Sequence, residues 1–478
     1  MINQIKKICC IGAGYVGGPS MAVIAYHCPH IQINVVDMNK ERIKAWNNND
    51  LDKLPVFEPG LPELIKECRN KNLFFSTEVE TNISKADMIF ISVNTPTKTK
   101  GIGAGQASDL KWIESCARQI GTFSNGLTIV VEKSTLPVKT AQTIQSILEA
   151  FSISDNNEDI NKKRFLILSN PEFLSEGTAI NDLESPDRIL IGGDNNHAIN
   201  SLRDIYLNWV DKEKILTTDL WSSELSKLIA NAFLAQRISS INSVSALCEV
   251  TGANINNVAK AIGTDSRIGT KFLHSGPGFG GSCFKKDISN LIYICNHYGL
   301  KEVASYWEKV IAINGWQQNR ITTIIVDKLF GTISGKKICV LGFSFKANTN
   351  DTRESPAINI CNDLLEEGCS LFIYDPKVDK KQISIDLAKY KNIETSSELK
   401  DSCWCISNSA YEAADNSDAL VILTDWDEFF NLDLQRLFEI MRKPCWIFDT
   451  RSVINPIKAK SYGFNVWKLG DGSFDSCR

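Results

Sequence analysis

Residues 8–18 read ICCIGAGYVGG, a short apolar run that leads into a glycine-rich turn. The apolar run predicts a buried strand, and Tyr15–His27 predicts a helix directly after it. In the pattern G-x-G-x-x-G, the first glycine permits a tight turn, the second lets a pyrophosphate approach the backbone, and the third lets helix and strand pack closely. Those positions are held by Gly12, Gly14 and Gly17. This context predicts a dinucleotide site at a helix N-terminus; the alternative is a glycine turn that binds no ligand.

A carboxylate ends the next predicted strand, residues 33–37. At this place in such a sheet, Asp37 can accept hydrogen bonds from both hydroxyls of a bound ribose, and it repels a 2′-phosphate. The sequence therefore favours NAD over NADP as the cofactor. Arg42 follows closely and keeps NADP open as an alternative.

The two ends of the chain share this alternation of apolar runs and helical stretches. In the first half, strands are expected at residues 8–12, 33–37, 88–93, 128–131 and 165–168. Apolar residues at helical spacing predict long helices over 221–251 and 303–330, either at a subunit interface or buried within one chain. Strands return at residues 337–343, 369–375, 419–423 and 446–448. We therefore predict an α/β protein with two Rossmann-like, doubly wound domains, residues 1–217 and 331–478, joined by a central all-helical segment, residues 218–330.

Polar residues follow three of the predicted strands. Ligands in parallel sheets bind outside the carboxyl ends of the strands, so these segments are expected near one edge. Loop capping is the alternative for any single segment, because serine, threonine and asparagine favour turns. The segments are Val93-Asn94-Thr95-Pro96-Thr97, Glu132-Lys133-Ser134-Thr135 and Asn170-Pro171-Glu172-Phe173.

The composition is that of a soluble globular protein: of 478 residues, 43% are hydrophobic and 23% charged, with a net charge of −4. This weak negative charge gives no support to a surface for nucleic acid or for a membrane. No apolar run reaches the roughly 18 residues of a membrane span, and we recognise no secretory signal. The 15 scattered cysteines are therefore expected as thiols in a reducing cytoplasm. Cys403 and Cys405 lack zinc-site spacing, so no metal is expected.

A second glycine-rich segment, GPGFGGSC at residues 276–283, ends in a cysteine just before a predicted helix. A loop of this kind can wrap a ligand with its backbone amides. A thiolate at a helix N-terminus is stabilised by the helix dipole and by N–H groups, which makes Cys283 a candidate nucleophile. Lys285 and Lys286 add positive potential, and Asp287 lies one helical turn away. The alternative is that the cysteine is a small buried apolar residue.

Lys227 and Asn231 are spaced i, i+4 on the predicted helix over 221–251, so they share a face. On an outer face they would form a solvated pair. On an inner face they would be costly without a partner. Beside a nucleophilic cysteine, the two side chains would donate hydrogen bonds to an oxyanion.

Nine segments match the motifs of one family, and the match runs from Lys6 to about Trp467. The chain resembles the UDP-glucose/GDP-mannose dehydrogenase family, and within it the animal and plant UDP-glucose 6-dehydrogenases. The resemblance implies an N-terminal NAD-binding domain, a central dimerisation domain and a C-terminal UDP-sugar-binding domain. The implied reaction is the NAD-dependent four-electron oxidation of UDP-glucose to UDP-glucuronate. The matching segments are Gly12–Pro19, Ser92–Lys98, Glu132–Pro137, Asn170–Ile180, Ser222–Ser240, Asp265–Gly269, Gly278–Asp287, Asp351–Ser355 and Tyr374–Val378.

The resemblance also implies catalytic roles. Cys283 would trap the sugar aldehyde as a thiohemiacetal, which is oxidised to a thioester and then hydrolysed. Lys227 and Asn231 would hold the developing oxyanion. Asp287 would orient a water or the thiol, and Glu172 would act as general base for the hydrolysis. The implied catalytic set is Cys283, Lys227, Asn231, Asp287, Glu172 and Thr135.

Binding residues are implied in the same way. For NAD they are Gly12, Gly14, Tyr15, Val16, Gly17, Asp37, Arg42, Val93, Asn94, Thr95, Ser134, Thr135, Glu176 and Arg353. For the UDP-sugar they are Glu172, Phe173, Leu174, Lys227, Asn231, Arg267, Phe279, Gly280, Phe345, Lys346 and Arg451. Arg267 would reach the sugar bound by a neighbouring subunit. The resemblance therefore implies a homo-oligomer, either a dimer through the central helix or a hexamer.

Three places depart from the family pattern, and one of them is Ala347-Asn348-Thr349-Asn350, where the commoner motif is Lys-Asp-Thr-Gly. Thr450 stands where the family usually has glycine, and His274 stands where the animal enzymes have lysine. These departures concern affinity and regulation more than chemistry. Three alternatives stay open: a dehydrogenase of a related nucleotide sugar, such as a UDP-N-acetylhexosamine or GDP-mannose; an inactive sugar-nucleotide binder; and a 2-hydroxyacid or 6-phosphogluconate-type dehydrogenase, which consumes one NAD per substrate.

Overall fold

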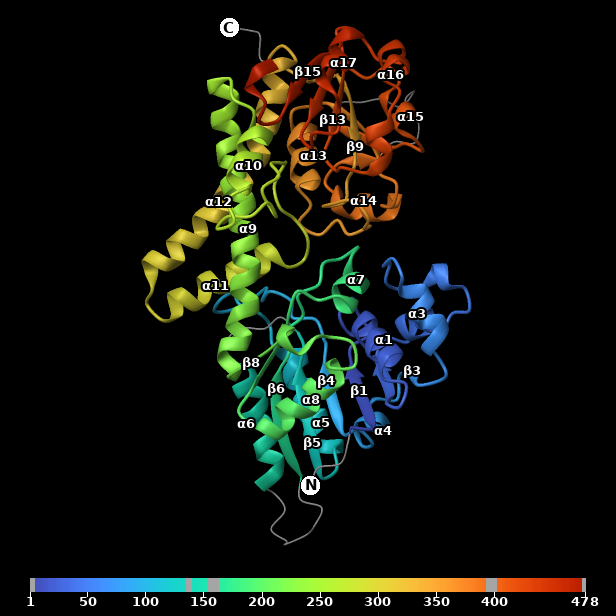
Figure 1. Ribbon diagram of the computed structural model, residues 1–478. Helices are drawn as coiled ribbons and strands as arrows, with labels where there is room; N and C mark the ends of the chain where they lie inside the picture. The colour runs from blue at the N-terminus through green and yellow to red at the C-terminus, as the bar shows by residue number, and fades with distance from the viewer. Residues whose placement is uncertain (1–4, 135–139, 154–162, 393–401, 475–478) are drawn as a thin grey trace. The chain divides into compact units, whose positions relative to one another are not determined.

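The computed structural model describes residues 5–134, 140–153, 163–392 and 402–474, and Figure 1 shows their helices and strands. The chain folds into two compact units, residues 1–230 and 231–478. Each unit contains one large sheet.

The first unit is built on an eight-stranded sheet with the order β3-β2-β1-β4-β5-β6-β7-β8. Neighbouring strands pair in parallel, except that β6 and β7 pair antiparallel. The order along the chain reverses between β1 and β4, and such a switch point is where α/β sheets bind ligands. The strands are β1 Lys7–Ile11, β2 Gln32–Val36, β3 Leu73–Ser76, β4 Met88–Ile91, β5 Leu127–Glu132, β6 Arg164–Ser169, β7 Ile189–Gly193 and β8 Ile215–Thr218.

Alternate side chains of these strands enter two apolar layers, one on each face of the sheet. Ile8 and Cys10 of β1 belong to the layer that contains α1, whereas Cys9 and Ile11 belong to the layer that contains α5. Because both faces are covered, the central strands carry apolar side chains on both faces, which explains why continuous apolar runs mark them in the sequence. The helices of this unit are α1 Gly17–His27, α2 Lys40–Trp46, α3 Leu61–Cys68, α4 Val79–Ile83, α5 Lys111–Phe123, α6 Thr140–Ile153, α7 Ala179–Glu184 and α8 Asn196–Tyr206.

Long helices open the second unit. Helix α9, Leu220–Thr251, runs from the end of the first unit into the second. It is followed by α10 Ile255–Gly263, α11 Phe284–His297 and α12 Lys301–Lys328. Helices α11 and α12 pack against each other, and α12 also packs against α13, Pro356–Glu366.

A seven-stranded sheet follows, with the order β11-β12-β10-β9-β13-β14-β15 and parallel pairing throughout. Its switch point lies between β9 and β13, as in the first sheet between β1 and β4. The strands are β9 Lys337–Leu341, β10 Ser370–Tyr374, β11 Lys391–Asn392, β12 Cys403–Ile406, β13 Ala419–Ile422, β14 Trp446–Asp449 and β15 Asn465–Lys468. The remaining helices are α14 Lys380–Asp386, α15 Ala410–Ala414, α16 Leu434–Ile440 and α17 Pro456–Ser461.

The predicted fold class is confirmed, because two Rossmann-like sheets are separated in the sequence by a helical region. The five strands expected in the first half correspond to β1, β2, β4, β5 and β6. The sequence patterns do not predict β3, β7 and β8, which are only four or five residues long and carry polar residues or glycine at their ends. The three-domain boundaries stay a prediction.

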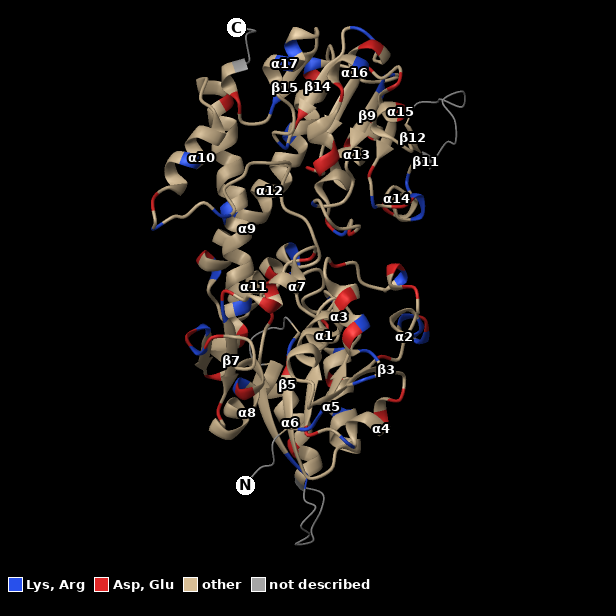
Figure 2. Cartoon of the chain, turned by 45° about the vertical axis from the view of Figure 1, so that its right-hand side comes forward, with Lys and Arg blue, Asp and Glu red and all other residues tan. Residues whose placement is uncertain are grey.

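Charged residues of both signs, 52 basic and 56 acidic in the whole sequence, are interspersed over the helices and loops of each unit (Figure 2). Within the part of the chain that the structure describes, no helix combines the length and the apolar character needed to cross a bilayer.

Candidate active site

The glycine turn after β1 has the geometry that its sequence predicts. Gly12 has a φ of +109°, and a Cβ atom there would collide with the carbonyl oxygen of Ser92. At Gly17 a Cβ would collide with the carbonyl oxygen of Gly12. At Gly14, in contrast, a Cβ would meet no atom within 4 Å. Packing therefore requires the first and third glycines, whereas the second leaves the backbone open to a pyrophosphate.

The N-terminus of α1 completes an anion site. Val16, the residue before the helix, makes no side-chain hydrogen bond to the N–H groups at the start of α1. Tyr15 and Val16 are half-buried in the same turn. The positive end of the helix dipole suits a phosphate, so this turn fits the predicted dinucleotide.

Asp37 lies directly after β2 and faces the glycine turn. One carboxylate oxygen accepts from the Ala13 N–H at 3.1 Å and from Arg42 Nη1, also at 3.1 Å. The other accepts from the Asn39 N–H at 2.9 Å. Arg42 is thus held by the carboxylate that is expected to bind the ribose, which weakens the NADP alternative.

We expect that Asp37→Ala will raise the ratio of kcat/KM for NADP over NAD by about tenfold or more, because the change removes the carboxylate that repels a 2′-phosphate and releases Arg42 to bind it. Initial rates with each cofactor measure the ratio. Arg42→Ala is the matched control and should retain the preference for NAD. An unchanged ratio in Asp37→Ala would contradict this role.

The polar strand ends of the first sheet are joined by hydrogen bonds. Ser134 Oγ donates to the carbonyl oxygen of Val93 at 2.8 Å. Lys133 is buried and donates to Asn170 Oδ1 at 3.1 Å, and Tyr206 donates to the same oxygen at 2.6 Å. These bonds connect the ends of β4, β5 and β6, as the sequence predicts. In the same loops Asn94 is exposed and Thr95 is buried, while Thr135 lies outside the described residues.

Glu172 and Lys227 form a buried pair. Lys227 Nζ lies 3.5 Å from Glu172 Oε1, and both side chains are almost fully buried. Glu172 Oε2 is also buried and makes no hydrogen bond to the described residues. Lys227 Nζ lies 5.4 Å from the centroid of the Phe173 ring. A buried ion pair with one unpaired oxygen is costly to keep, which points to function. Leu174 and Glu176 follow in the same loop and are half-buried.

Cys283 lies immediately before α11 in the second unit. It is half-buried, whereas every other cysteine that the structure describes is buried. Its carbonyl oxygen accepts from the Asp287 N–H at 2.8 Å, which is the first turn of α11. Asp287 is buried and accepts from Asn231 Nδ2 at 2.6 Å. The predicted partners of the cysteine are therefore linked: Asn231 of α9 holds the carboxylate one turn beyond Cys283.

The glycine loop before Cys283 fits against the segment before α13. The Gly281 N–H donates to the carbonyl oxygen of Arg353 at 2.8 Å. A Cβ at Gly280 would lie 2.6 Å from the carbonyl oxygen of Glu354 and 2.9 Å from Phe345 Cβ. Lys285 Nζ pairs with the Glu354 carboxylate at 2.7 Å. Only glycine allows this approach, which explains the composition of the loop.

The predicted nucleotide contacts lie around the end of β9. Arg451 Nη2 donates to the carbonyl oxygen of Phe345 at 3.3 Å, and Lys346 Nζ lies 5.5 Å from the centroid of the Phe345 ring. Lys346 can meet a phosphate as a point charge. Thr450 is fully buried and donates its hydroxyl to the carbonyl oxygen of Ile422 at 2.5 Å, so the structure accommodates this departure from glycine. His274 is exposed.

Two predicted arginines have exposed side chains. The side chain of Arg267 is 87% exposed and pairs with Asp265 at 2.6 Å. Arg353 is 53% exposed and pairs with Asp351 at 2.6 Å. Arg353 and Arg267 therefore extend from the surface of the second unit.

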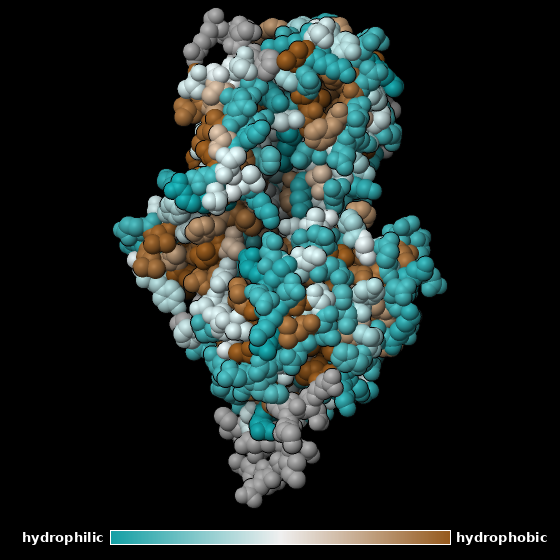
Figure 3. Space-filling view, in the orientation of Figure 1, coloured by the Kyte–Doolittle hydropathy of each residue, from teal (hydrophilic) through white to brown (hydrophobic). Residues whose placement is uncertain are grey.

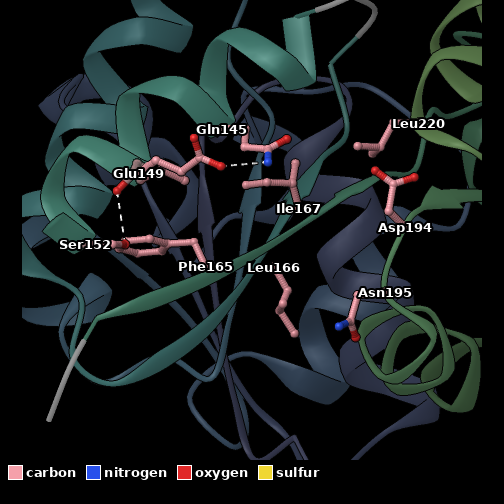
Figure 4. A pocket seen from close by; sticks show the side chains of 10 residues that line it. Gln145, Glu149, Ser152, Phe165, Leu166, Ile167, Asp194, Asn195 and Leu220 are labelled. Carbon is pink, nitrogen blue, oxygen red and sulfur yellow. Dashed lines mark hydrogen bonds between the residues drawn. The ribbon is translucent and has the colours of Figure 1, made fainter.

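Figure 4 shows a small pocket in the first unit, between α6 and β6. Its lining includes Glu149, Phe165 and Asp194, and Gln145 donates to Glu149 at 2.8 Å. Among the described residues that line it, none is a predicted binding or catalytic residue.

Comparison with known proteins places these residues in one family. The sequence matches the NAD binding domain of the UDP-glucose/GDP-mannose dehydrogenase family over residues 6–210, its central domain over 221–316 and its UDP binding domain over 339–456. The chain belongs to the UDP-glucose/GDP-mannose dehydrogenase family. It is thus an NAD-binding oxidoreductase, and the predicted cofactor class and enzyme class are confirmed.

Individual members of the UDP-glucose/GDP-mannose dehydrogenase family are similar over their whole length. UDP-glucose 6-dehydrogenase 3 of Oryza sativa subsp. japonica is 54% identical over 475 residues, which cover 97% of each chain. UDP-glucose 6-dehydrogenase of Gallus gallus is 54% identical over 473 residues, which cover 98% of this chain and 93% of that one. The structure of a UDP-glucose dehydrogenase from the archaeon Pyrobaculum islandicum aligns with a TM-score of 0.80 at 27% identity, over 98% of this chain and 99% of that one.

Some residues that organise this dehydrogenase site are missing from the sequence-based prediction. Asn314 and Gln317 of α12 bind the glycine loop, and neither is predicted. Lys133 is predicted only as part of a polar strand end, and its bond to Asn170 joins two of those ends. The signal for Asn314 and Gln317 is present in the sequence, because amides at 314 and 317 interrupt an apolar stripe at helical spacing.

Proposed function

We propose that this chain oxidises UDP-glucose to UDP-glucuronate, with two molecules of NAD consumed per sugar. The observation that carries the proposal is Cys283 at the first turn of α11, next to a buried Asn231–Asp287 pair. Full-length similarity to plant and animal UDP-glucose 6-dehydrogenases supports this substrate. A related nucleotide sugar is the alternative.

NAD supplies the hydride acceptor in each of the two oxidations. The turn at Gly14 and the N-terminus of α1 would hold its pyrophosphate, and Asp37 would hold its ribose. The exposed Arg353 would add a cationic contact. Phe345, Lys346 and Arg451 would hold the nucleotide of the substrate.

Cys283 acts between the two oxidations. Its sulfur adds to the C6 aldehyde: the C–S bond forms, the carbonyl π bond breaks, and the oxygen takes a proton. Oxidation of this thiohemiacetal gives a thioester. Water then attacks the thioester carbon, the C–S bond breaks, and a proton returns to sulfur. The covalent adduct makes the second oxidation possible and retains the reactive aldehyde.

The buried polar pairs support these steps. Lys227 and Asn231 stabilise the oxyanion by donating N–H groups. Glu172 accepts the proton of the attacking water, for which its unpaired Oε2 is suited. Asp287 orients a water or the thiol near the cysteine. The catalytic role of Thr135 follows from the family resemblance alone.

A homo-oligomer in the cytoplasm completes the proposal. Apolar side chains are exposed around the turn between α11 and α12, where Figure 3 shows hydrophobic surface: Leu300 is 50% exposed and Val303 43%. Two exposed tyrosines, Tyr298 and Tyr306, lie in the same part of the chain. An exposed surface of this kind favours contact with another chain. A second copy is the expected occupant, through the central helices as a dimer or in a hexamer, with Arg267 reaching the sugar of the neighbouring subunit.

The decisive measurement is the NADH yield per UDP-glucose, with the product identified by mass. Two NADH and the mass of UDP-glucuronate are expected, because oxidation from alcohol to carboxylate removes four electrons. A yield of one would favour the 2-hydroxyacid or 6-phosphogluconate-type alternative, and binding without turnover would favour an inactive binder. Faster turnover of UDP-N-acetylglucosamine, UDP-N-acetylmannosamine or GDP-mannose would contradict the substrate assignment.

A further inference from the structure

Four amide side chains are buried beneath the glycine-rich loop of the second unit. We name Asn242 of α9 with Asn314, Gln317 and Gln318 of α12 the amide cluster. Each of them exposes between 0 and 8% of its surface. The catalytic scheme above uses none of them.

The position of the amide cluster on α12 is unusual for a buried helix face. Residues 314, 317, 318 and 321 follow helical spacing, so the amides continue the stripe formed by the buried Val310, Ile321 and Ile325. Leucine or isoleucine would fill such positions at lower cost. A buried amide is destabilising unless its hydrogen bonds are satisfied. The partners of these amides therefore indicate why they are there.

Three of the four amides hydrogen-bond to the backbone of the glycine loop, and Asn242 Nδ2 is buried without a partner among the described residues. The Gly276 N–H donates to Asn242 Oδ1 at 2.9 Å, and Gln317 Nε2 donates to the Gly276 carbonyl oxygen at 3.1 Å. The Phe279 N–H donates to Asn314 Oδ1 at 2.8 Å, and Asn314 Nδ2 donates to the Phe279 carbonyl oxygen at 3.1 Å. The backbone N–H and carbonyl groups of Gly276 and Phe279 are thus all hydrogen-bonded to side chains of the amide cluster.

Gly278 lies between these two fixed residues. Its φ is +132°, and a Cβ there would lie 2.7 Å from Asn314 Oδ1 and 3.1 Å from Gln318 Nε2. Gln318 is in turn held by Asn359, which donates to Gln318 Oε1 at 2.7 Å. The loop therefore fits directly onto the cluster, and the cluster is anchored to α13.

We propose that the amide cluster positions the sulfur of Cys283 for capture of the aldehyde. Gly276 and Phe279 lie seven and four residues before Cys283, and the Gly281 N–H is bound to Arg353 on the other side of the loop. The path of the chain into α11 is thus fixed before it reaches the cysteine. The inference rests on the proposed function, in which that sulfur adds to the C6 aldehyde. Asn314 and Gln317 are positioning residues, because they act through the loop.

The test measures NADH per UDP-glucose while a hydrazine reagent traps released aldehyde. Asn314→Leu removes both bonds to Phe279. Gln317→Met removes the single bond to Gly276 with little change in volume, and it keeps the test decisive if the first variant does not fold. In each folded variant the yield should fall from two NADH toward one, and the trapped hydrazone should appear, because a misplaced sulfur lets the aldehyde escape.

Ile325→Val is the matched control, since Ile325 lies on the same helix in the apolar core. It should lose some thermal stability but retain a yield of two, because partial unfolding lowers the amount of active enzyme without changing its stoichiometry. A yield of two without hydrazone in folded Asn314→Leu or Gln317→Met overturns the inference, as does a drop in the control. Cys283→Ala separates the two hypotheses. If this variant still forms UDP-glucuronate at the normal rate, Cys283 is not the nucleophile and the proposed function fails. If it forms none while folded Asn314→Leu and Gln317→Met keep a yield of two NADH, only the positioning role of the amide cluster is refuted.

Discussion

Replacing Cys283 by alanine is expected to lower the rate of UDP-glucuronate formation by roughly 10³-fold or more, because the covalent intermediate that permits the second oxidation is lost. The side chain contributes little to packing, since it is half-buried at the start of α11. The variant should therefore fold and bind UDP-glucose. Product mass and NADH release measure the effect, and calorimetry measures the retained affinity.

Cys295→Ala is the matched control for that substitution. Cys295 lies on α11, the helix that begins directly after Cys283, but it is buried. Its loss should reduce the melting temperature and leave the turnover of folded enzyme close to that of the wild type. If Cys283→Ala made UDP-glucuronate at a normal rate, the thioester scheme would be wrong.

The second large effect is expected in the glycine turn of the first unit. Gly17→Ala should destabilise the fold by about 3 kcal/mol, because the new Cβ would collide with the carbonyl oxygen of Gly12, and backbone cannot move aside as a flexible side chain can. Cys10 Sγ, at 3.1 Å from that Cβ, restricts movement on another side. The melting temperature and the yield of folded protein measure this loss.

Gly14→Ala in the same turn is the substitution to compare with Gly17→Ala. A Cβ at Gly14 meets no protein atom within 4 Å, and its φ is not in the left-handed region. The variant should therefore melt near the wild-type temperature and yet bind NAD more weakly, because the methyl group occupies the path of the pyrophosphate. Equal losses of stability in both variants would show that the two glycines do not divide packing and binding in this way.

The sequence is sufficient to predict the parts of the fold that depend on local pattern. Strands buried on both faces leave continuous apolar runs, and a turn with φ of +109° at Gly12 requires glycine. Strand order and the antiparallel pairing of β6 with β7 are not local properties. Short strands such as β3 and β8 form because they pair with neighbouring strands. Each has only four residues, which is too few for its hydrophobic pattern to be recognised in the sequence.

In the candidate site, too, residues that depend on a local pattern are predictable, whereas contacts between distant residues are not. Cys283 and Asp37 are predictable because a nucleophile or a ribose-binding carboxylate must occupy a particular place relative to a turn. The bond between Asn231 and Asp287 joins residues 56 positions apart, so spacing alone does not predict it. Asn314 interrupts an apolar stripe, and that signal is visible in the sequence. The identity of its partner, the Phe279 backbone, requires the three-dimensional structure.

The uneven burial of the thiols determines how an oxidant would affect this protein. Burial raises the pKa of Cys10 to about 12 and that of Cys28 to about 11, so these sulfurs are protonated and shielded at neutral pH. Peroxide reacts with accessible thiolates, and among the described cysteines Cys283 alone is not buried. Oxidative damage should therefore fall first on the reacting sulfur and stop turnover before the fold is affected. A thiol reductant should restore activity as long as oxidation has not passed the sulfenic acid.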